Sequence, residues 1–215
     1  HGLVDHHARV IFPILHRRRL FAEVDNFRLY DFHAQGGEVD ENVFAYSNLS
    51  NGQAALVVYN NRFGDTSGWI KTSVPYLVKE GGEGHLLESN LADALQLQGS
   101  NDEFVLYRDV ISHLWFLRPL GEVRERGMHF DLGAYNHMVL ADFRIVSGPE
   151  YSNLYTTLNG AGTADLPFAL EEISFSPLLQ PLRAVINPGN LKSLIELTST
   201  EHQPETASPV LEETL

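Results

Sequence analysis

The sequence contains no cysteine, which excludes disulfides, thiolate metal sites and cysteine nucleophiles. Long hydrophobic runs are also missing, because no apolar stretch approaches the roughly 18 residues that suggest a transmembrane helix. A basic leader followed by an apolar segment is not visible, so a soluble cytoplasmic protein is favoured while the compartment stays open. Met128 and Met138 are the methionines, and His1 stands first. The chain is therefore expected to be a processed product or part of a longer protein.

Basic residues are few: 15 Lys and Arg stand against 28 Asp and Glu, which gives a formal net charge of −13. Nucleic acids and anionic membrane surfaces both attract proteins through clustered Lys and Arg. Neither is therefore expected as a partner. An acidic excess of this kind ordinarily serves solubility. The hydrophobic content of 43% is sufficient for a real core.

Residues 1–24 are expected to be helical. Val10, Ile14 and Leu20 belong to an apolar series with spacings of three and four, and arginines lie between its members. Pro13 removes a backbone donor and clashes with the preceding turn, which predicts a kink or a restart of the helix there.

Residues 25–147 consist mainly of short runs rich in β-branched and aromatic residues, with turn residues between them. Short strands with little helix between them predict a mainly β fold, an antiparallel Greek-key β-sandwich. Residues 77–103 interrupt the series and predict a loop rich in Gly and Glu with a short helix at 87–95. The expected strands are 27–32, 43–47, 54–60, 69–76, 104–109, 113–119, 128–133 and 137–146.

Residues 148–197 are expected to form a small helical appendage that follows the sandwich. Asp165 can cap a helix that has Pro167 in its first turn. Asn187-Pro188-Gly189 predicts a break between two later helices. Residues 198–215 are polar and acidic with two prolines, a composition typical of a disordered tail.

The stretch VFAYSNLSNGQAALVVYNN, residues 43–61, predicts a β-hairpin. Asn51-Gly52 tolerates the positive φ angles of a tight turn. The run ALVVY lacks polar alternation, which predicts a strand covered on both faces. The hairpin is therefore interpreted as core of the sandwich, without chemistry of its own.

Groups that could carry chemistry are sparse. His129 and Asp131 share one face of a predicted strand, where they could bind a metal or form an acid/base couple, although a solvent-exposed strand face explains them as well. Glu38, Asp40 and Glu41 could bind calcium, but their spacing does not match an EF-hand, so a solvated loop is expected. The nucleophile-elbow, dinucleotide-binding, P-loop and HExxH motifs are absent. No catalytic residue and no metal ligand is assigned.

The two tryptophans receive different predictions. Trp69 follows Gly68 at a strand edge and is the candidate for a carbohydrate contact, since exposed aromatic rings stack on sugar rings. Trp115 is surrounded in sequence by Leu114 and Phe116, which predicts a buried ring.

The helix with ILHRRRLFAEV, the hairpin VFAYS–turn–ALVVYNN and the later stretch MHFDLGAYNHMVLADF occur in a recognisable order. Over about residues 8–146, this order resembles the end of an α-amylase superfamily glycoside hydrolase (glycoside hydrolase family 13). There the (β/α)8 barrel is followed by a C-terminal β-sandwich. The family's catalytic Asp, Glu and second Asp lie on barrel strands that have no match in this chain.

The resemblance implies a non-catalytic region of an α-amylase-like glycosidase that acts on α-glucans. Its expected partners are the catalytic (β/α)8 barrel of the same parent protein, which it would stabilise, and α-glucan. No cofactor is expected in this chain, and calcium is left open for the parent enzyme. An alternative is a free-standing carbohydrate-binding β-sandwich that uses Trp69, and a compact hydrolase ranks last. Val10, Ile14 and Phe21 are expected on a helix face left uncovered by the barrel.

Overall fold

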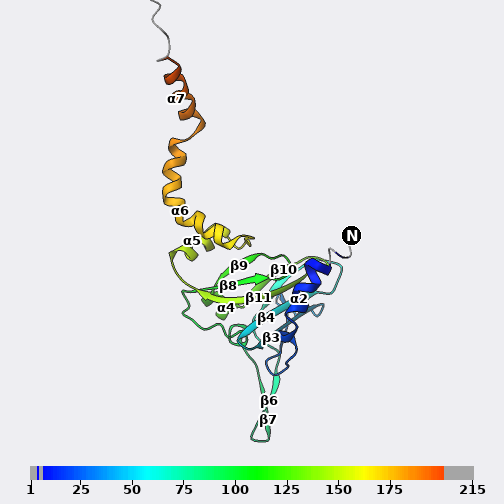
Figure 1. The fold of residues 1–215 in the computed structure, drawn as a ribbon. Coiled ribbons are helices and arrows are strands. Elements are labelled where there is room, and N and C mark those ends of the chain that lie inside the picture. Colours follow the sequence, from blue (N-terminus) through cyan, green and yellow to red (C-terminus); the bar gives the residue numbers. More distant parts are fainter. Residues whose placement is uncertain (1–3, 5–6, 201–215) are drawn as a thin grey trace, which may run out of the picture. The chain divides into compact units, whose positions relative to one another are not determined.

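A computed structural model describes residue 4 and residues 7–200 of the chain (Figure 1). The chain divides into two units, His1–Leu170 and Glu171–Leu215. The first unit is mainly β, as predicted, and all pairings between its strands are antiparallel. The predicted boundaries after residues 24, 147 and 197 stay predictions.

Two sheets form the sandwich. The six-stranded sheet has the order β1-β3-β4-β11-β8-β9, so β11 returns between β4 and β8 by a long connection. Its strands are β1 (Arg28–Tyr30), β3 (Val43–Ser50), β4 (Gln53–Asn60), β11 (His137–Val146), β8 (Phe104–Asp109) and β9 (Trp115–Pro119). The three-stranded sheet contains β10 (Met128–Leu132), β5 (Thr66–Ile70) and β2 (His33–Ala34), in that order.

Side chains from both sheets share one core. Leu56 and Val58 of β4 belong to the same buried cluster as Ile70 of β5 and Phe130 of β10. The short helix α3 (Leu91–Ala94) adds Leu91 to this cluster. Seven of the eight predicted strand runs contain a strand in the structure, because the β-branched and aromatic residues that mark these runs also fill the core. The run 69–76 is displaced: β5 ends at Ile70, and β6 begins at Tyr76.

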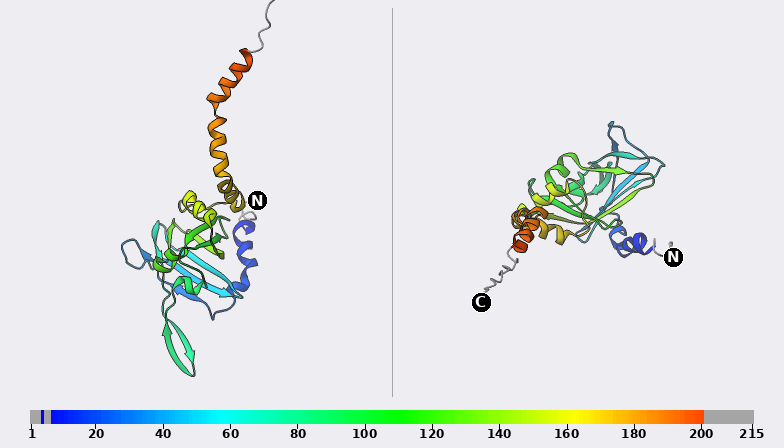
Figure 2. Two further views of the ribbon diagram at one scale, coloured as in Figure 1. Left: turned by 90° about the vertical axis from the view of Figure 1, so that its left-hand side faces the viewer. Right: turned by 90° about the horizontal axis from the view of Figure 1, so that it is seen from above.

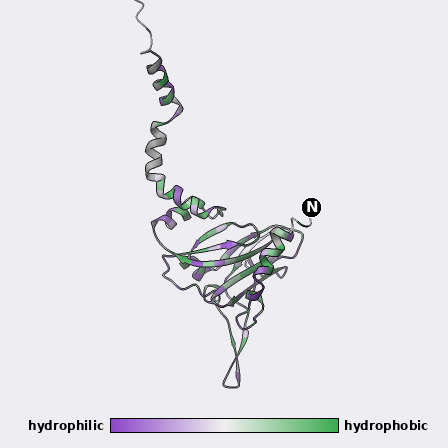
Figure 3. Ribbon diagram, viewed as in Figure 1, coloured by the Kyte–Doolittle hydropathy of each residue, from purple (hydrophilic) through white to green (hydrophobic). Residues whose placement is uncertain are grey.

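Residues 77–103 differ from the prediction of a loop with one helix. A hairpin of β6 (Tyr76–Glu80) and β7 (Glu83–Leu87) occupies the first half of this segment, and Figure 1 shows it extending from the sandwich. Hydrophobic and hydrophilic residues are mixed along it (Figure 3). None of the residues whose burial is described in these two strands is buried, so the sequence shows no core-facing side there and predicted a loop. The helix α4 (Leu120–Arg126) was also not expected, whereas α5 (Pro149–Leu158) lies within the residues predicted to form the helical appendage.

The N-terminal segment is helical but interrupted. It consists of a π-helical turn η1 (His7–Ile11), α2 (Phe12–His16) and a 3₁₀ turn η2 (Arg18–Phe21). Pro13 lies in the first turn of α2, where its missing N–H is not needed, so the predicted restart at Pro13 is confirmed. η2 packs on β3 and β4 at the outer face of the six-stranded sheet (Figure 2).

The C-terminal part contains two longer helices, α6 (Leu166–Val185) and α7 (Pro188–Thr200). The Phe168 N–H donates to Asp165 Oδ1 at 3.0 Å, which confirms the predicted cap of α6. α7 begins at Pro188, as the predicted break requires, and continues to Thr200. The rest of the predicted disordered tail, 201–215, lies outside the described residues. No helix among the residues described is long and apolar enough to span a membrane.

Candidate functional site

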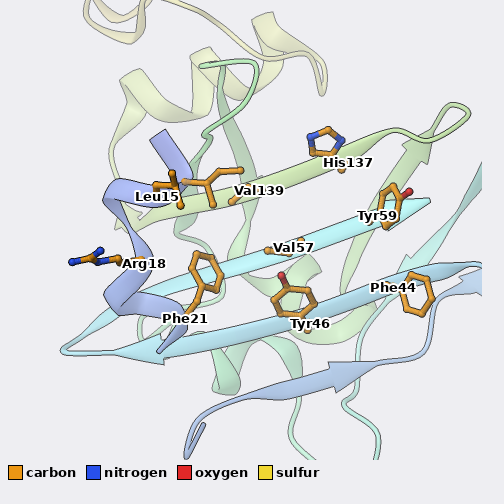
Figure 4. Close-up of a pocket in the computed structure, with 10 residues that line it drawn as sticks. Leu15, Arg18, Phe21, Phe44, Tyr46, Val57, Tyr59, His137 and Val139 are labelled. Carbon is orange, nitrogen blue, oxygen red and sulfur yellow. The ribbon is translucent and has the colours of Figure 1, made fainter. Parts of the chain in front are cut away.

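The outer face of the six-stranded sheet carries an open groove of about 510 Å³ (Figure 4). One wall is the N-terminal helical segment, and the floor is formed by β3, β4 and β11. The residues that line it are Ile14, Leu15, Arg18, Phe21, Phe44, Tyr46, Val57, Tyr59, His137 and Val139.

The floor is built from cross-strand neighbours. Phe44 pairs with Tyr59, and Tyr59 pairs in turn with His137 across β4 and β11. The ring centroids of Phe44 and Tyr59 are 6.4 Å apart, and those of Tyr59 and His137 are also 6.4 Å apart. Aromatic pairs at such distances stabilise one another beyond their burial. A second row, which joins Tyr46 to Val57 and then Val139, completes the floor.

This floor corrects the interpretation of the hairpin as core on both faces. Leu56 and Val58 are fully buried between the sheets, whereas Val57 and Tyr59 point to the other face and are only partly covered. Strand residues alternate between the two faces, so a run of apolar residues is expected wherever both faces are needed. In this hairpin the second face lines a groove.

The helical wall is fixed to the sheet by apolar packing and by an ion pair. Ile14 and Phe21 pack against a buried cluster that contains Val139. The Arg17 guanidinium forms two hydrogen bonds of 2.8 Å with the Asp142 carboxylate of β11. A bidentate pair of this kind fixes orientation as well as distance. The helical wall is therefore an integral part of the domain.

The chemistry of the groove is that of an apolar surface. The described side chains that line it include no carboxylate, serine or cysteine, so they offer no pair of carboxylic acids. Burial raises the pKa of the Tyr46 hydroxyl, which therefore stays protonated at neutral pH. The groove is suited to covering by apolar groups.

Trp69 lies on β5 between His33 of β2 and His129 of β10, with which it is paired. Its ring is half-buried. The Arg126 guanidinium carbon lies 4.6 Å from the ring centroid, and the His129 ring approaches edge-on at 4.9 Å. A sugar that stacked on the ring face under Arg126 would first displace that guanidinium. The carbohydrate contact at Trp69 stays a prediction.

His129 and Asp131 share one face of β10, as the strand pattern predicted, and β5 brings Ser67 between them. Ser67 Oγ lies 3.1 Å from His129 Nε2 and donates to Asp131 Oδ1 at 2.6 Å. The Asp131 side chain is 80% exposed, so water solvates the carboxylate and competes with any ligand. The sequence pattern gave no sign of Ser67, because its position depends on the pairing of β5 with β10.

Asp40, in the acidic loop considered for calcium, is a structural residue. Its carboxylate accepts hydrogen bonds from the Asn42 side chain at 3.0 Å and from Thr66 Oγ1 at 2.8 Å, and Arg62 lies 3.2 Å away. Burial raises the pKa of Asp40, but these donors and the arginine outweigh it and leave the pKa below its ordinary value. Glu38 and Glu41 are exposed. Within the described residues, no group of three His, Asp, Glu or Cys side chains is placed to hold a metal ion.

Trp115 is half-buried, which corrects the prediction of an enclosed ring. Its spatial neighbours include the guanidinium groups of Arg144 and Arg108, whose carbons lie 4.8 Å and 5.7 Å from the ring centroid. The apolar residues beside it in sequence do not decide what lies over its ring.

No protein-family model and no curated protein matches this sequence.

Proposed function

We propose that this chain is a non-catalytic β-sandwich region of an α-amylase-like glycosidase that acts on α-glucans. Its role is to stabilise the catalytic (β/α)8 barrel of the same parent protein. The observation that supports this role is an apolar surface around the groove, where Phe12, Leu15 and Phe44 are 50%, 53% and 52% exposed. Exposed apolar surface of this kind marks an interaction site.

The position of the N-terminal segment supports the barrel as the partner. The stretch that resembles the last barrel helix is also the stretch that forms the groove wall. It is attached to the sandwich through Ile14 and Phe21, which are partly buried against the sheet. Both residues also line the open groove, so their place on the uncovered face stays a prediction, and the side chain of Val10 lies outside the described residues. The exposed face of α2 contains Phe12 and Leu15.

Charge substitutions in the parent protein test this docking surface. We expect Leu15→Glu combined with Phe44→Glu to lower the melting temperature of the barrel, because two charges would be buried without partners. The matched control is Phe63→Glu, since Phe63 is 87% exposed and lies outside the groove lining. Calorimetry would measure each transition. Equal melting temperatures for the double variant and the control would contradict the proposal.

Two further measurements bear on the same proposal. The purified 215-residue chain should not hydrolyse maltooligosaccharides, because the groove lining offers no pair of carboxylates. The protein in its source should have a mass well above 24.1 kDa, the mass of this chain. Robust turnover by the chain alone, or a source protein of 24.1 kDa, would overturn the assignment.

A further inference from the structure

A second hollow, of about 470 Å³, lies on the outer face of the six-stranded sheet, and its lining is more polar than that of the groove. Its volume falls in the range of small-molecule sites, which is roughly 300–1,000 Å³. The hollow is formed by residues from the β3–β4 turn, the C-terminal end of α2, β9 and β11. The lining residues are Arg17, Gly52, Gln53, Ala54, Trp115, Asp142, Phe143 and Arg144.

The lining contains two arginines, and Arg144 is the one without an anionic partner. Its guanidinium carbon lies 4.8 Å from the Trp115 ring centroid. The backbone of Arg144 pairs with Leu106 of β8, but its side chain forms no hydrogen bond and no ion pair with any described residue. A cation over an indole ring is attracted to the ring electrons, and this attraction holds the guanidinium in place while its N–H donors stay open. Arg108, beside the hollow, contacts the same ring at 5.7 Å.

The carboxylate in the lining, that of Asp142, is paired with Arg17. Asp142 accepts both of its 2.8 Å hydrogen bonds from Arg17, so the charge of Arg17 is balanced and that of Arg144 is not. The lining therefore carries one net positive charge, from Arg17 and Arg144 against Asp142, in a chain whose formal net charge is −13. An unbalanced cation of this kind attracts a small anion into the hollow.

The backbone of β11 is irregular where it borders the hollow. The register between β11 and β8 shifts between Ala141 and Arg144, which is a β-bulge. Asp142 has a φ of +58°, a left-handed conformation that costs free energy for a residue other than glycine. Bulges redirect side chains and are frequent beside functional sites. This one separates the Asp142 carboxylate, directed to Arg17, from the Arg144 guanidinium over Trp115.

We infer that this hollow binds a small ligand with an oxyanion, a phosphate or a carboxylate, through the Arg144 guanidinium. The planar donors of arginine match such groups, and the Gln53 amide lies in the same lining for a neighbouring polar group. The inference rests on the hollow alone and goes beyond the proposed role in stabilising a barrel. It holds for the chain whether or not that role is correct.

Titration calorimetry at low salt on the full chain tests the inference. The probes are inorganic phosphate, glucose 1-phosphate and the neutral maltotriose. We expect binding of the two anions and weaker or no binding of maltotriose. Tighter binding of glucose 1-phosphate than of phosphate would assign a phosphorylated sugar, and equal binding would assign the oxyanion alone.

Two arginine variants distinguish anion binding at this hollow from a general attraction of anions to positive charge. Arg144→Gln should weaken anion binding about tenfold or more, because a charge-assisted hydrogen bond is lost. Arg126→Gln is the matched control, since Arg126 lies over Trp69 at 4.6 Å in the same kind of contact but outside the hollow. It should leave binding unchanged. The absence of anion binding, or equal losses in both variants, would overturn the inference. Far-ultraviolet circular dichroism would establish that both variants fold.

Discussion

Asp40 shows how a charged residue that the sequence places in a solvated loop becomes structural. Its side chain is 7% exposed, and its carboxylate is held by Asn42, Thr66 and Arg62. Three donors on one buried carboxylate stabilise its charged form, so the pKa of Asp40 in the folded chain lies below the ordinary value of 3.8. A calcium ion is not needed to explain the acid at this position.

The lowered pKa of Asp40 makes its contribution to stability depend on pH. An unfolded chain binds the proton more readily, so the contribution is complete above the ordinary pKa of 3.8 and is lost as pH falls through the lower folded pKa. Asp40→Asn should reduce the free energy of unfolding by about 1–3 kcal/mol at pH 7. Urea unfolding should show this difference shrinking at pH 3. Glu38→Gln, at an exposed residue of the same loop, is the control, and a difference that is independent of pH would contradict the explanation.

The tryptophans show that neighbours in sequence do not predict neighbours in space. Trp115 has apolar sequence neighbours, yet Arg108 lies opposite it in the sheet and Arg144 reaches its ring from β11. Trp69 was the candidate for a carbohydrate contact, and Arg126 of α4 lies over its ring. α4 had no recognisable pattern, so the guanidinium that covers Trp69 could not be anticipated.

At the scale of elements, the one-residue connection between α4 and β10 requires a glycine. Gly127 follows α4 with a φ of +82°, and a Cβ at this position would overlap the backbone carbonyl of Ile70 in β5. Gly52, in the β3–β4 turn, has a similar φ of +74° but no atom within 4 Å of a Cβ. Gly127 also has a ψ of −152°, in a region that is essentially restricted to glycine, so a side chain there would meet both backbone strain and steric overlap.

Alanine should therefore be more costly at Gly127 than at Gly52. Gly52→Ala should cost about 1–2 kcal/mol, the penalty of a left-handed conformation alone. Gly127→Ala should cost about 2–4 kcal/mol, because β10 must also shift away from β5. Urea unfolding of both variants measures the difference. Equal losses would show that the close approach of the two strands is relaxed without cost.

Elements with a strong periodic pattern of apolar residues could be predicted from the sequence. Elements whose position depends on contacts with distant parts of the chain could not. β8 and β11 have the predicted bounds, because Val105, Tyr107 and Leu140 mark them as strands with buried faces. β6 and β7 lack such a face, and β2 has two residues, which is too short for any pattern. The groove could not be predicted, because it requires a helical wall placed by the Arg17–Asp142 pair, 125 residues apart.

The whole molecule combines two opposing influences on association. The groove and α2 expose apolar side chains that favour contact with another surface. The formal net charge of −13 opposes contact between two copies of the chain. Charge repulsion is screened by salt, with a Debye length of about 10 Å at 0.1 M and about 3 Å at 1 M. The attraction between apolar surfaces is not weakened in this way.

The isolated chain should therefore associate more strongly as salt increases. We expect sedimentation velocity to show monomer at low salt and a growing fraction of dimer at high salt. The double variant Leu15→Glu, Phe44→Glu should stay monomeric at both, because it adds charge to the surface that the two copies would share. Leu77→Glu on the exposed β6–β7 hairpin adds one charge elsewhere and should preserve the salt effect. If the dimer instead dissociates as salt increases, complementary charges, and not the apolar surface around the groove, hold the two copies together.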